Sequence, residues 1–218
     1  MTSYSYLVTD LTEACENDGT EFLSNLPKMI NRGEERLTRD LDDYGLMTFT
    51  SVAVPVSTAE VTLPTGTRIV KNFNIIADGS RINLLLRTDE FLNDYWPVSA
   101  STGTPAYYAR TGDTTVKLAP TPTSAYDGTV VHISKPTALS SVSETNYFTD
   151  RCYDTLFNAC MVEAMVFQKN WQVVELFEKR YLTGVESLRN QARRTRRDDM
   201  QTPRSPEGAD NNVVKGEN

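Results

Sequence analysis

The single histidine, His132, is the first residue to consider for catalysis, and it lies in the apolar run VVHIS. An acyl-transfer hydrolase needs a nucleophile, a base and an orienting acid, so every such scheme in this chain would depend on His132. A histidine between apolar strand residues is more often structural than catalytic. The sequence also has no phosphate-binding glycine loop, Walker lysine or zinc-protease helix motif. These observations argue against kinase, NTPase and zinc-protease activity.

Neighbouring acids such as Glu34–Glu35 and Asp89–Glu90 could support glycoside hydrolysis, which uses a pair of carboxylates. The chain holds 29 acidic residues, however, and acids on helices usually face solvent or pair with arginines at helical spacing. A cell-wall hydrolase is therefore only a weak alternative. The sequence indicates that the protein is not an enzyme.

The three cysteines, Cys15, Cys152 and Cys160, are odd in number and far apart in the chain, which argues against a disulfide framework. Cys152 and Cys160 are eight residues apart in a helical stretch, so they fall on roughly one face and are expected in the core. A metal site would need more ligands at closer spacing. We expect no metal and no cofactor.

A cluster of arginines marks the end of the last helical pattern: Arg189, Arg193, Arg194, Arg196 and Arg197, with Arg204 following. These cations could complement the negative end of a helix, grip phosphates, or dock on an acidic surface of another subunit. The net charge of −7 and the lack of interleaved aromatic residues disfavour a nucleic-acid reader. The polar tail that follows favours docking, because a segment that cannot fold alone often orders along a partner.

Acidic residues are concentrated near the N-terminus, where they include Glu34, Glu35, Asp40, Asp42 and Asp43. Hydrophobic residues make up 39% of the chain and charged residues 23%, close to the average for soluble globular proteins. No apolar run is long enough to span a bilayer, and the first residues lack the features of a signal peptide. We expect a folded protein with no membrane partner.

Apolar residues at helical spacing predict helices near both ends of the chain. We expect one helix over residues 5–17, one from an N-cap at Ser24 or Asn25 to about Asp43, one starting at a Thr149 cap, and one carrying Val174 to Leu188. Pro27 fits the first turn of the second helix, where its missing N–H would have no partner in any case.

The chain between these helices has the β-branched, alternating texture of antiparallel strands. The expected strands are Thr48–Val56, Ala59–Leu63, Arg68–Ile76, Ser80–Leu86, Ala106–Arg110, Thr114–Ala119 and Thr129–Ser134. Asp78–Gly79, residues 111–113 and Asp127–Gly128 have turn chemistry, and residues 88–95 predict one short helix.

The order of the elements predicts an α+β fold in which the two terminal pairs of helices close around one core. The simplest such architecture is a four-helix bundle with an inserted antiparallel β-rich domain and a disordered C-terminal arm. The expected boundaries are 1–46 for the first helical pair, 47–136 for the inserted domain, 137–197 for the second helical pair and 198–218 for the arm.

Two stretches of the chain carry family-like motifs. Residues 22–46, FLSNLPKMINRGEERLTRDLDDYGL, have an apolar-proline start, an acidic-arginine centre and an arginine-aspartate-leucine end. Residues 105–164 contain PAYYAR, then LAPTP, then the entry into a helix at NYFTDRCYDTLFNACMVEA. In these motifs and in element order, most of residues 5–195 resembles the head-to-tail adaptor (connector) proteins of tailed bacteriophages, especially those of short-tailed phages.

The resemblance implies a structural virion protein at the head–tail junction, synthesised in the host bacterial cytoplasm. Such proteins form a homo-oligomeric ring, usually a dodecamer, between the portal protein and a tail or nozzle protein. Genomic double-stranded DNA passes through the ring during ejection without its sequence being read. In this family the C-terminal helix and arm reach the portal, which makes the six clustered arginines portal-docking candidates.

The resemblance also gives the five N-terminal acids a candidate role in lining the DNA channel, because a channel wall should repel phosphate. A solvated outer helix face is the equally open alternative. A DNA-binding accessory protein that uses Arg193–Arg197 is a second function, and it predicts salt-dependent duplex binding by the monomer. The cell-wall hydrolase predicts lytic activity that is lost when one carboxylate pair is replaced.

Overall fold

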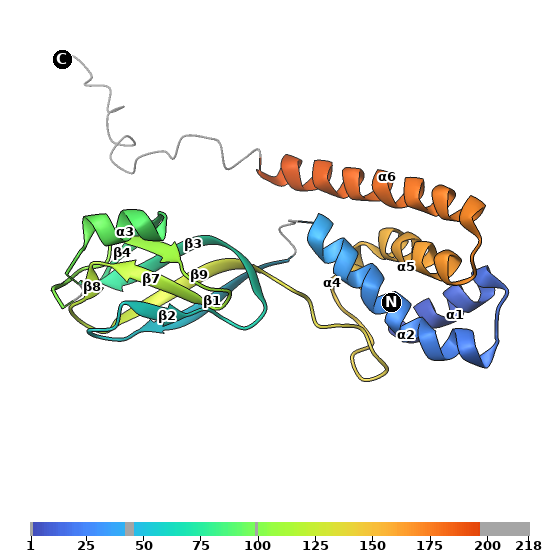
Figure 1. Ribbon diagram of the computed structural model, residues 1–218, viewed down its shortest axis with the longest axis horizontal. Helices are drawn as coiled ribbons and strands as arrows, with labels where there is room; N and C mark the ends of the chain where they lie inside the picture. The colour runs from blue at the N-terminus through green and yellow to red at the C-terminus, as the bar shows by residue number, and fades with distance from the viewer. Residues whose placement is uncertain (1, 42–45, 99, 197–218) are drawn as a thin grey trace, which may run out of the picture.

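The computed structural model describes residues 2–41, 46–98 and 100–196. Most of the helices gather at one end of the molecule, and the strands form the other end (Figure 1). In these residues the helices are α1 (Tyr4–Cys15), α2 (Thr20–Asp40), α3 (Asp89–Tyr95), α4 (Tyr147–Arg151), α5 (Tyr153–Phe167) and α6 (Trp171–Arg196). Only α3 lies on the strand end, and α6 runs along the outside of the other helices (Figure 1).

Helix α2 starts earlier than its sequence suggests. It begins at Thr20, after Gly19, so the predicted N-cap at Ser24 or Asn25 is wrong and Pro27 lies inside the helix. The extra turn carries Phe22, which is only 1% exposed, into the helical core. Burial of a large aromatic side chain outweighs the local preference for a helix start next to proline.

The predicted third helix is divided into two. Asn146 caps α4, and its side chain accepts from the backbone N–H groups of Phe148 (3.0 Å) and Thr149 (3.3 Å). The Thr149 hydroxyl in turn accepts from Asn146 N at 2.9 Å, so Thr149 completes a capping box and is not itself the N-cap. Cys152, with φ −134° and ψ 29°, then separates α4 from α5.

Helix α5 forms the middle layer of the helical end, and two glycines allow its neighbours to approach closely. A Cβ atom on Gly33 of α2 would lie 2.8 Å from Cys160 Sγ, and one on Gly184 of α6 would lie 2.6 Å from Thr155 Oγ1. Both distances are shorter than van der Waals contact, so neither position accommodates a larger side chain without movement. The buried thiol of Cys160 fills this contact, as expected for a core cysteine.

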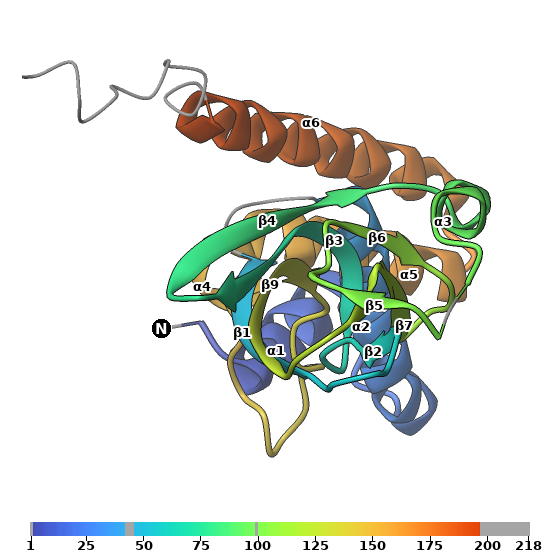
Figure 2. The same ribbon diagram turned by 90° about the vertical axis from the view of Figure 1, so that its left-hand side faces the viewer.

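The strands form a mixed sheet that is nearly closed. Its members are β1 (Met47–Val54), β2 (Glu60–Thr62), β3 (Thr67–Ala77), β4 (Ser80–Leu86), β6 (Tyr107–Arg110), β7 (Thr115–Ala119) and β9 (Tyr126–Ser134), in the order β1-β9-β3-β4-β6-β7-β2. All neighbours are antiparallel except β4 and β6, which run parallel. The outer strands β1 and β2 approach each other, as the end-on view shows (Figure 2). A small parallel pair, β5 (Thr102–Gly103) and β8 (Thr121–Pro122), lies beside it.

Two predicted turns have different outcomes. Asp78 and Gly79 have positive φ values of 50° and 74° and connect β3 to β4, so that prediction is confirmed. Asp127–Gly128 is wrong as a turn, because both residues lie inside β9 and pair with β1 and β3. A Cβ on Gly128 would lie 2.9 Å from Phe73 Cε2, so this glycine serves close packing inside the sheet.

The structure is α+β, as the sequence predicts, but the predicted four-helix bundle with an inserted antiparallel domain is wrong. The break at Cys152 gives the helical end a fifth helix among the described residues. The chain between β4 and β6 contains α3, and this crossover produces a parallel pair in the sheet. The proposed boundaries after residues 46, 136 and 197 stay predictions, and the predicted arm, 198–218, lies outside the described residues.

His132 is buried in the sheet and joins three strands. The Thr67 hydroxyl donates to Pro64 O at 2.7 Å, so it accepts from His132 Nδ1–H at 3.1 Å. Nε2 then accepts from the Thr50 hydroxyl at 3.1 Å. Both ring nitrogens are therefore satisfied in the neutral imidazole, and burial lowers the pKa of His132. This geometry gives the histidine a structural role.

We expect Gly184→Ala to destabilise the fold by about 2 kcal/mol, because the new methyl group would overlap the Thr155 side chain. Urea unfolding measures this change. In a Thr155→Ala background the obstruction is absent, so Gly184→Ala should become stabilising by roughly 0.5–1 kcal/mol through helix propensity. Equal effects of Gly184→Ala in the two backgrounds would contradict the close contact.

The lowered pKa of His132 predicts a loss of stability in mild acid. The unfolded chain binds a proton near the ordinary pKa of about 6.5, whereas the folded chain binds it only at lower pH. Stability should therefore be constant above about pH 7.5 and fall below about pH 6.5, until the pKa of the folded state is passed. Glu34, whose pKa is raised, acts in the opposite direction.

Urea unfolding of the wild type and His132→Gln at pH 7.5 and 5.5 isolates the histidine, since carboxylates such as Glu34 are common to both proteins. The stability difference between them should shrink at the lower pH. An unchanged difference would show that His132 does not titrate differently in the folded and unfolded states.

Candidate docking surface

Three side-chain interactions hold α6 against the C-terminal half of α2. The Arg36 guanidinium donates to both carboxylate oxygens of Glu178, at 2.8 and 2.5 Å. Its Cζ atom lies 4.2 Å from the ring centroid of Tyr181, which is fully buried. The Tyr181 hydroxyl donates to the Asp40 carboxylate at 2.5 Å. A bidentate ion pair, a cation–π contact and a charge-assisted hydrogen bond together fix the position of α6.

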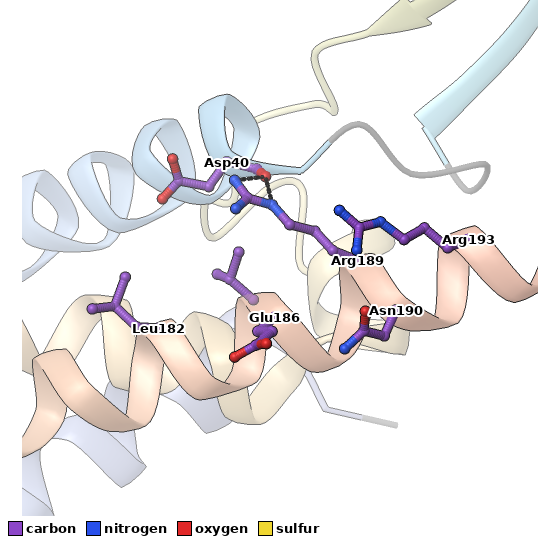
Figure 3. A pocket seen from close by; sticks show the side chains of 7 residues that line it. Asp40, Leu182, Glu186, Arg189, Asn190 and Arg193 are labelled. Atoms are coloured by element: carbon purple, nitrogen blue, oxygen red, sulfur yellow. Dashed lines mark hydrogen bonds between the residues drawn. The ribbon is translucent and has the colours of Figure 1, made fainter.

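Arg189, about two helical turns beyond Tyr181 on α6, adds a further contact. Its Nε and Nη2 atoms donate to the backbone oxygen of Asp40 at 3.0 and 2.8 Å (Figure 3). Asp40 is the last residue of α2, so this carbonyl has no partner within its own helix. Arg189 therefore caps α2 and complements the negative end of that helix. We call Arg36, Asp40, Glu178, Tyr181 and Arg189 the α6 clamp.

Two members of the clamp, Arg36 and Tyr181, keep their protonation states at neutral pH. The hydrogen bond to Glu178 raises the pKa of the Arg36 guanidinium, although burial acts in the opposite direction. Burial, and after it the hydrogen bond to Asp40, raises the pKa of the Tyr181 hydroxyl. Arg36 therefore stays protonated and Tyr181 stays a neutral donor across the physiological range.

A cavity of about 500 Å³ opens beside the clamp (Figure 3). It is lined by Asp40, Leu182, Val185, Glu186, Arg189, Asn190 and Arg193. A second hollow on α6 is lined by Thr183, Glu186, Ser187, Asn190, Gln191 and Arg194. Arg193 and Arg194 are exposed, and the lining is mostly polar. A polar, open surface of this kind suits contact with another macromolecule better than capture of a small molecule.

The described residues offer little for catalysis. They contain no group of three or more His, Cys, Asp or Glu residues arranged to hold a metal ion. The Glu34 carboxylate is buried and hydrogen-bonded, and Asp89 is held by Lys117 at 3.1 Å. Neither acidic pair therefore presents two free carboxylates to a substrate.

A family model described as SU10 adaptor protein matches residues 2–207, which is most of the chain. The chain belongs to the SU10 adaptor protein family. It is thus a structural adaptor of the phage virion, at the head–tail junction, and the resemblance found in the sequence is confirmed at this level. No curated protein matches the chain. In the described part of the chain, no helix is long and apolar enough to cross a membrane.

The structure describes four of the six predicted docking arginines of the adaptor. Arg189 binds the end of α2, whereas Arg193 and Arg194 are exposed on the following turn. Arg196 is the last residue of α6. Arg197 and Arg204 lie outside the described residues.

The three predicted channel acids that the structure describes, Glu34, Glu35 and Asp40, do not form one surface. Asp40 belongs to the clamp, and Glu35 is exposed with its carboxylate 3.3 Å from Lys135 Nζ. Glu34 is only 3% exposed and faces the linker before α4. Asp42 and Asp43 lie outside the described residues.

Glu34 instead holds the chain that returns from the sheet to the helices. Its carboxylate accepts from Leu139 N at 3.1 Å and from Asn146 Nδ2 at 2.6 Å. Burial raises the pKa of Glu34, while these hydrogen bonds and the nearby Lys135 lower it. Glu34, in the acidic centre of the motif at residues 22–46, therefore has a structural role.

Sequence reasoning did not find the clamp. The helical acids were expected to face solvent or to pair with arginines at helical spacing, but Arg32 and Arg36 pair with acids of other helices. Arg32 lies 3.5 Å from Glu163 of α5, and Arg36 binds Glu178 of α6. The available signal was the i, i+3 spacing of Glu178 and Tyr181, which places a carboxylate and a phenol on the same face of α6.

We expect Tyr181→Phe to destabilise the adaptor by about 1–2 kcal/mol, because Asp40 loses a charge-assisted hydrogen bond while the ring remains. Tyr6→Phe is the matched control: this ring is 55% exposed, and its loss of a hydroxyl should change stability by less than about 0.5 kcal/mol. Chemical denaturation measures the stability of both variants. Equal losses of stability in Tyr181→Phe and Tyr6→Phe would show that the Tyr181 hydroxyl does not stabilise the clamp.

Proposed function

We propose that this adaptor assembles as a ring that docks on the phage portal through the last turns of α6, and that the ring joins the portal to a tail or nozzle protein. The observation that carries the proposal is the clamped helix. Helix α6 extends beyond α5 (Figure 1), and Arg193 and Arg194 are exposed just past the clamp. A rigid helix presenting cations suits recognition of an acidic protein surface.

Two features favour binding to a protein and argue against binding to DNA. Arg189 is already used to cap α2, which leaves fewer free cations for phosphates. The total charge of −7 also opposes approach to DNA. Leu176 and Leu182 are about half exposed on α6, and they are suited to burial against a second protein.

The passage of the genome through the ring is part of the same proposal. A closed ring of identical subunits needs two different faces on each subunit, one for each neighbour. We assign no individual residue to the channel wall, because Glu34, Glu35 and Asp40, the predicted acids that the structure describes, do not lie together at a free surface. The short-tailed phage type and the dodecamer stay predictions from the resemblance.

Charge reversal tests the docking role. We expect the Arg193→Glu/Arg194→Glu double variant to lose binding to purified portal by at least about tenfold, because two attractive contacts become repulsive. Lys179→Glu/Arg180→Glu, an equal charge change earlier on α6, should bind within about twofold of the wild type. Negative-stain imaging and mass measurement of portal mixtures provide the readout.

Three outcomes would count against the proposal. Normal portal binding by Arg193→Glu/Arg194→Glu would remove the docking role of α6, and an equal loss in the control pair would show a general charge effect. Salt-dependent binding of duplex DNA that disappears only in the Arg193/Arg194 variant, with portal binding intact, would instead favour the DNA-binding function.

A further inference from the structure

The far end of the sheet carries a group of exposed aromatic side chains around α3. Phe91 and Tyr95 stack on each other with ring centroids 5.8 Å apart and an interplanar angle of 8°. Tyr107 of β6 meets Tyr95 edge-on at 4.8 Å and Phe91 at 5.4 Å. Arg87 lies over the Phe91 ring at 5.6 Å. We call Arg87, Phe91, Tyr95 and Tyr107 the α3 aromatic surface.

Contacts between α3 and the neighbouring strands hold the α3 aromatic surface in place. Leu92 of α3 is buried against Ala109 and Ala119 of the neighbouring strands. Lys117 Nζ donates to Asp89 at 3.1 Å and to Asn93 at 2.6 Å, which ties α3 to β7. Tyr95 nevertheless remains 46% exposed and Phe91 37% exposed. Fixed, half-exposed rings lose little conformational entropy when a partner binds.

The rim of this surface is acidic. Glu90 and Asp94 are exposed on α3, and within residues 2–41, 46–98 and 100–196 no salt bridge involves either of them. An aromatic surface bordered by such acids fits an extended ligand that brings apolar rings and one positive charge. Proline supplies the rings, and arginine supplies the charge.

The chain itself contains such a segment. Residues 202–206 read Thr-Pro-Arg-Ser-Pro, with prolines three apart and an arginine between them. In a polyproline II helix, which has three residues per turn, Pro203 and Pro206 lie on one edge about 9 Å apart. In Figure 1 the C-terminal end of α6 is directed toward the strands, whereas Figure 2 shows this end on the left and α3 on the right. The segment follows that end by a few residues.

We propose that the segment Thr202–Pro206 of this chain docks on the α3 aromatic surface as a polyproline II helix. Pro203 and Pro206 pack against the rings of Phe91, Tyr95 and Tyr107, and Arg204 lies toward Glu90 and Asp94. The chemistry is that of a proline-containing peptide on an aromatic surface. This inference does not depend on portal docking, which concerns Arg193 and Arg194 of α6.

A labelled peptide tests the proposal in the full-length chain. The probe is a fluorescein-labelled peptide of residues 199–210, and the receptor carries Pro203→Ser/Pro206→Ser so that its own arm does not compete. We expect saturable binding by fluorescence anisotropy, weakened at least about tenfold by Tyr95→Ala in the receptor. Tyr6→Ala, at an exposed aromatic residue of α1, is the matched control and should leave binding unchanged.

Two further measurements make the test independent of any effect of Tyr95→Ala on folding. Glu90→Gln/Asp94→Asn leaves the rings intact and should weaken binding several-fold at low salt and reduce its salt dependence. The wild-type chain should bind the probe several-fold more weakly than the receptor, because its own prolines compete.

The proposal is overturned if a probe with both prolines replaced by serine binds equally well, if Tyr95→Ala and Tyr6→Ala have the same effect, or if no binding occurs at millimolar peptide. The two proposals fail separately. If the Arg193→Glu/Arg194→Glu variant bound portal normally while the receptor still bound the peptide, portal docking would be wrong and the peptide-binding proposal would be supported.

Discussion

The close approach of α2 and α6 to the two sides of α5 is the constraint on which the rest of the helical end depends. It requires Gly33 against Cys160 and Gly184 against Thr155, because larger side chains would separate the helices. Once both outer helices lie at these distances, Arg36 reaches Glu178 and Tyr181 reaches Asp40. The polar clamp is thus a consequence of apolar packing, since short hydrogen bonds form only after the helices have been brought into register.

The same end of α2 connects the helices to the sheet. Arg68, near the start of β3, donates to the Thr38 carbonyl, and Arg189 donates to the Asp40 carbonyl. Two arginines from distant parts of the chain therefore satisfy the terminal carbonyls of one helix, which would otherwise need water. Glu34 holds the returning linker a little earlier on α2. Helix α2 is the element against which α6, the sheet and the linker are all positioned.

This arrangement separates two kinds of charged residue that look alike in the sequence. Arg189 and Arg36 have their hydrogen-bonding capacity used within the subunit, whereas Arg193 and Arg194 face solvent. The acids divide in the same way: Glu34 and Asp40 stabilise the fold, and Glu35 stays at the surface. For an adaptor that must bind other virion proteins, the useful residues are those that the fold leaves free. Only burial and hydrogen bonding distinguish them.

The sequence by itself determined the local elements and the family. Alternation and turn residues predicted seven of the nine described strands to within a few residues, because a strand with one buried face must alternate, but they missed the short strands β5 and β8. The proline and arginine motifs indicated the adaptor family. Tertiary structure alone decided that α2 starts at Thr20, that Gly128 lies inside β9, that β4 and β6 run parallel, and that Arg189 caps α2. Each of these depends on contacts between residues far apart in the chain, and such contacts leave no mark in local spacing.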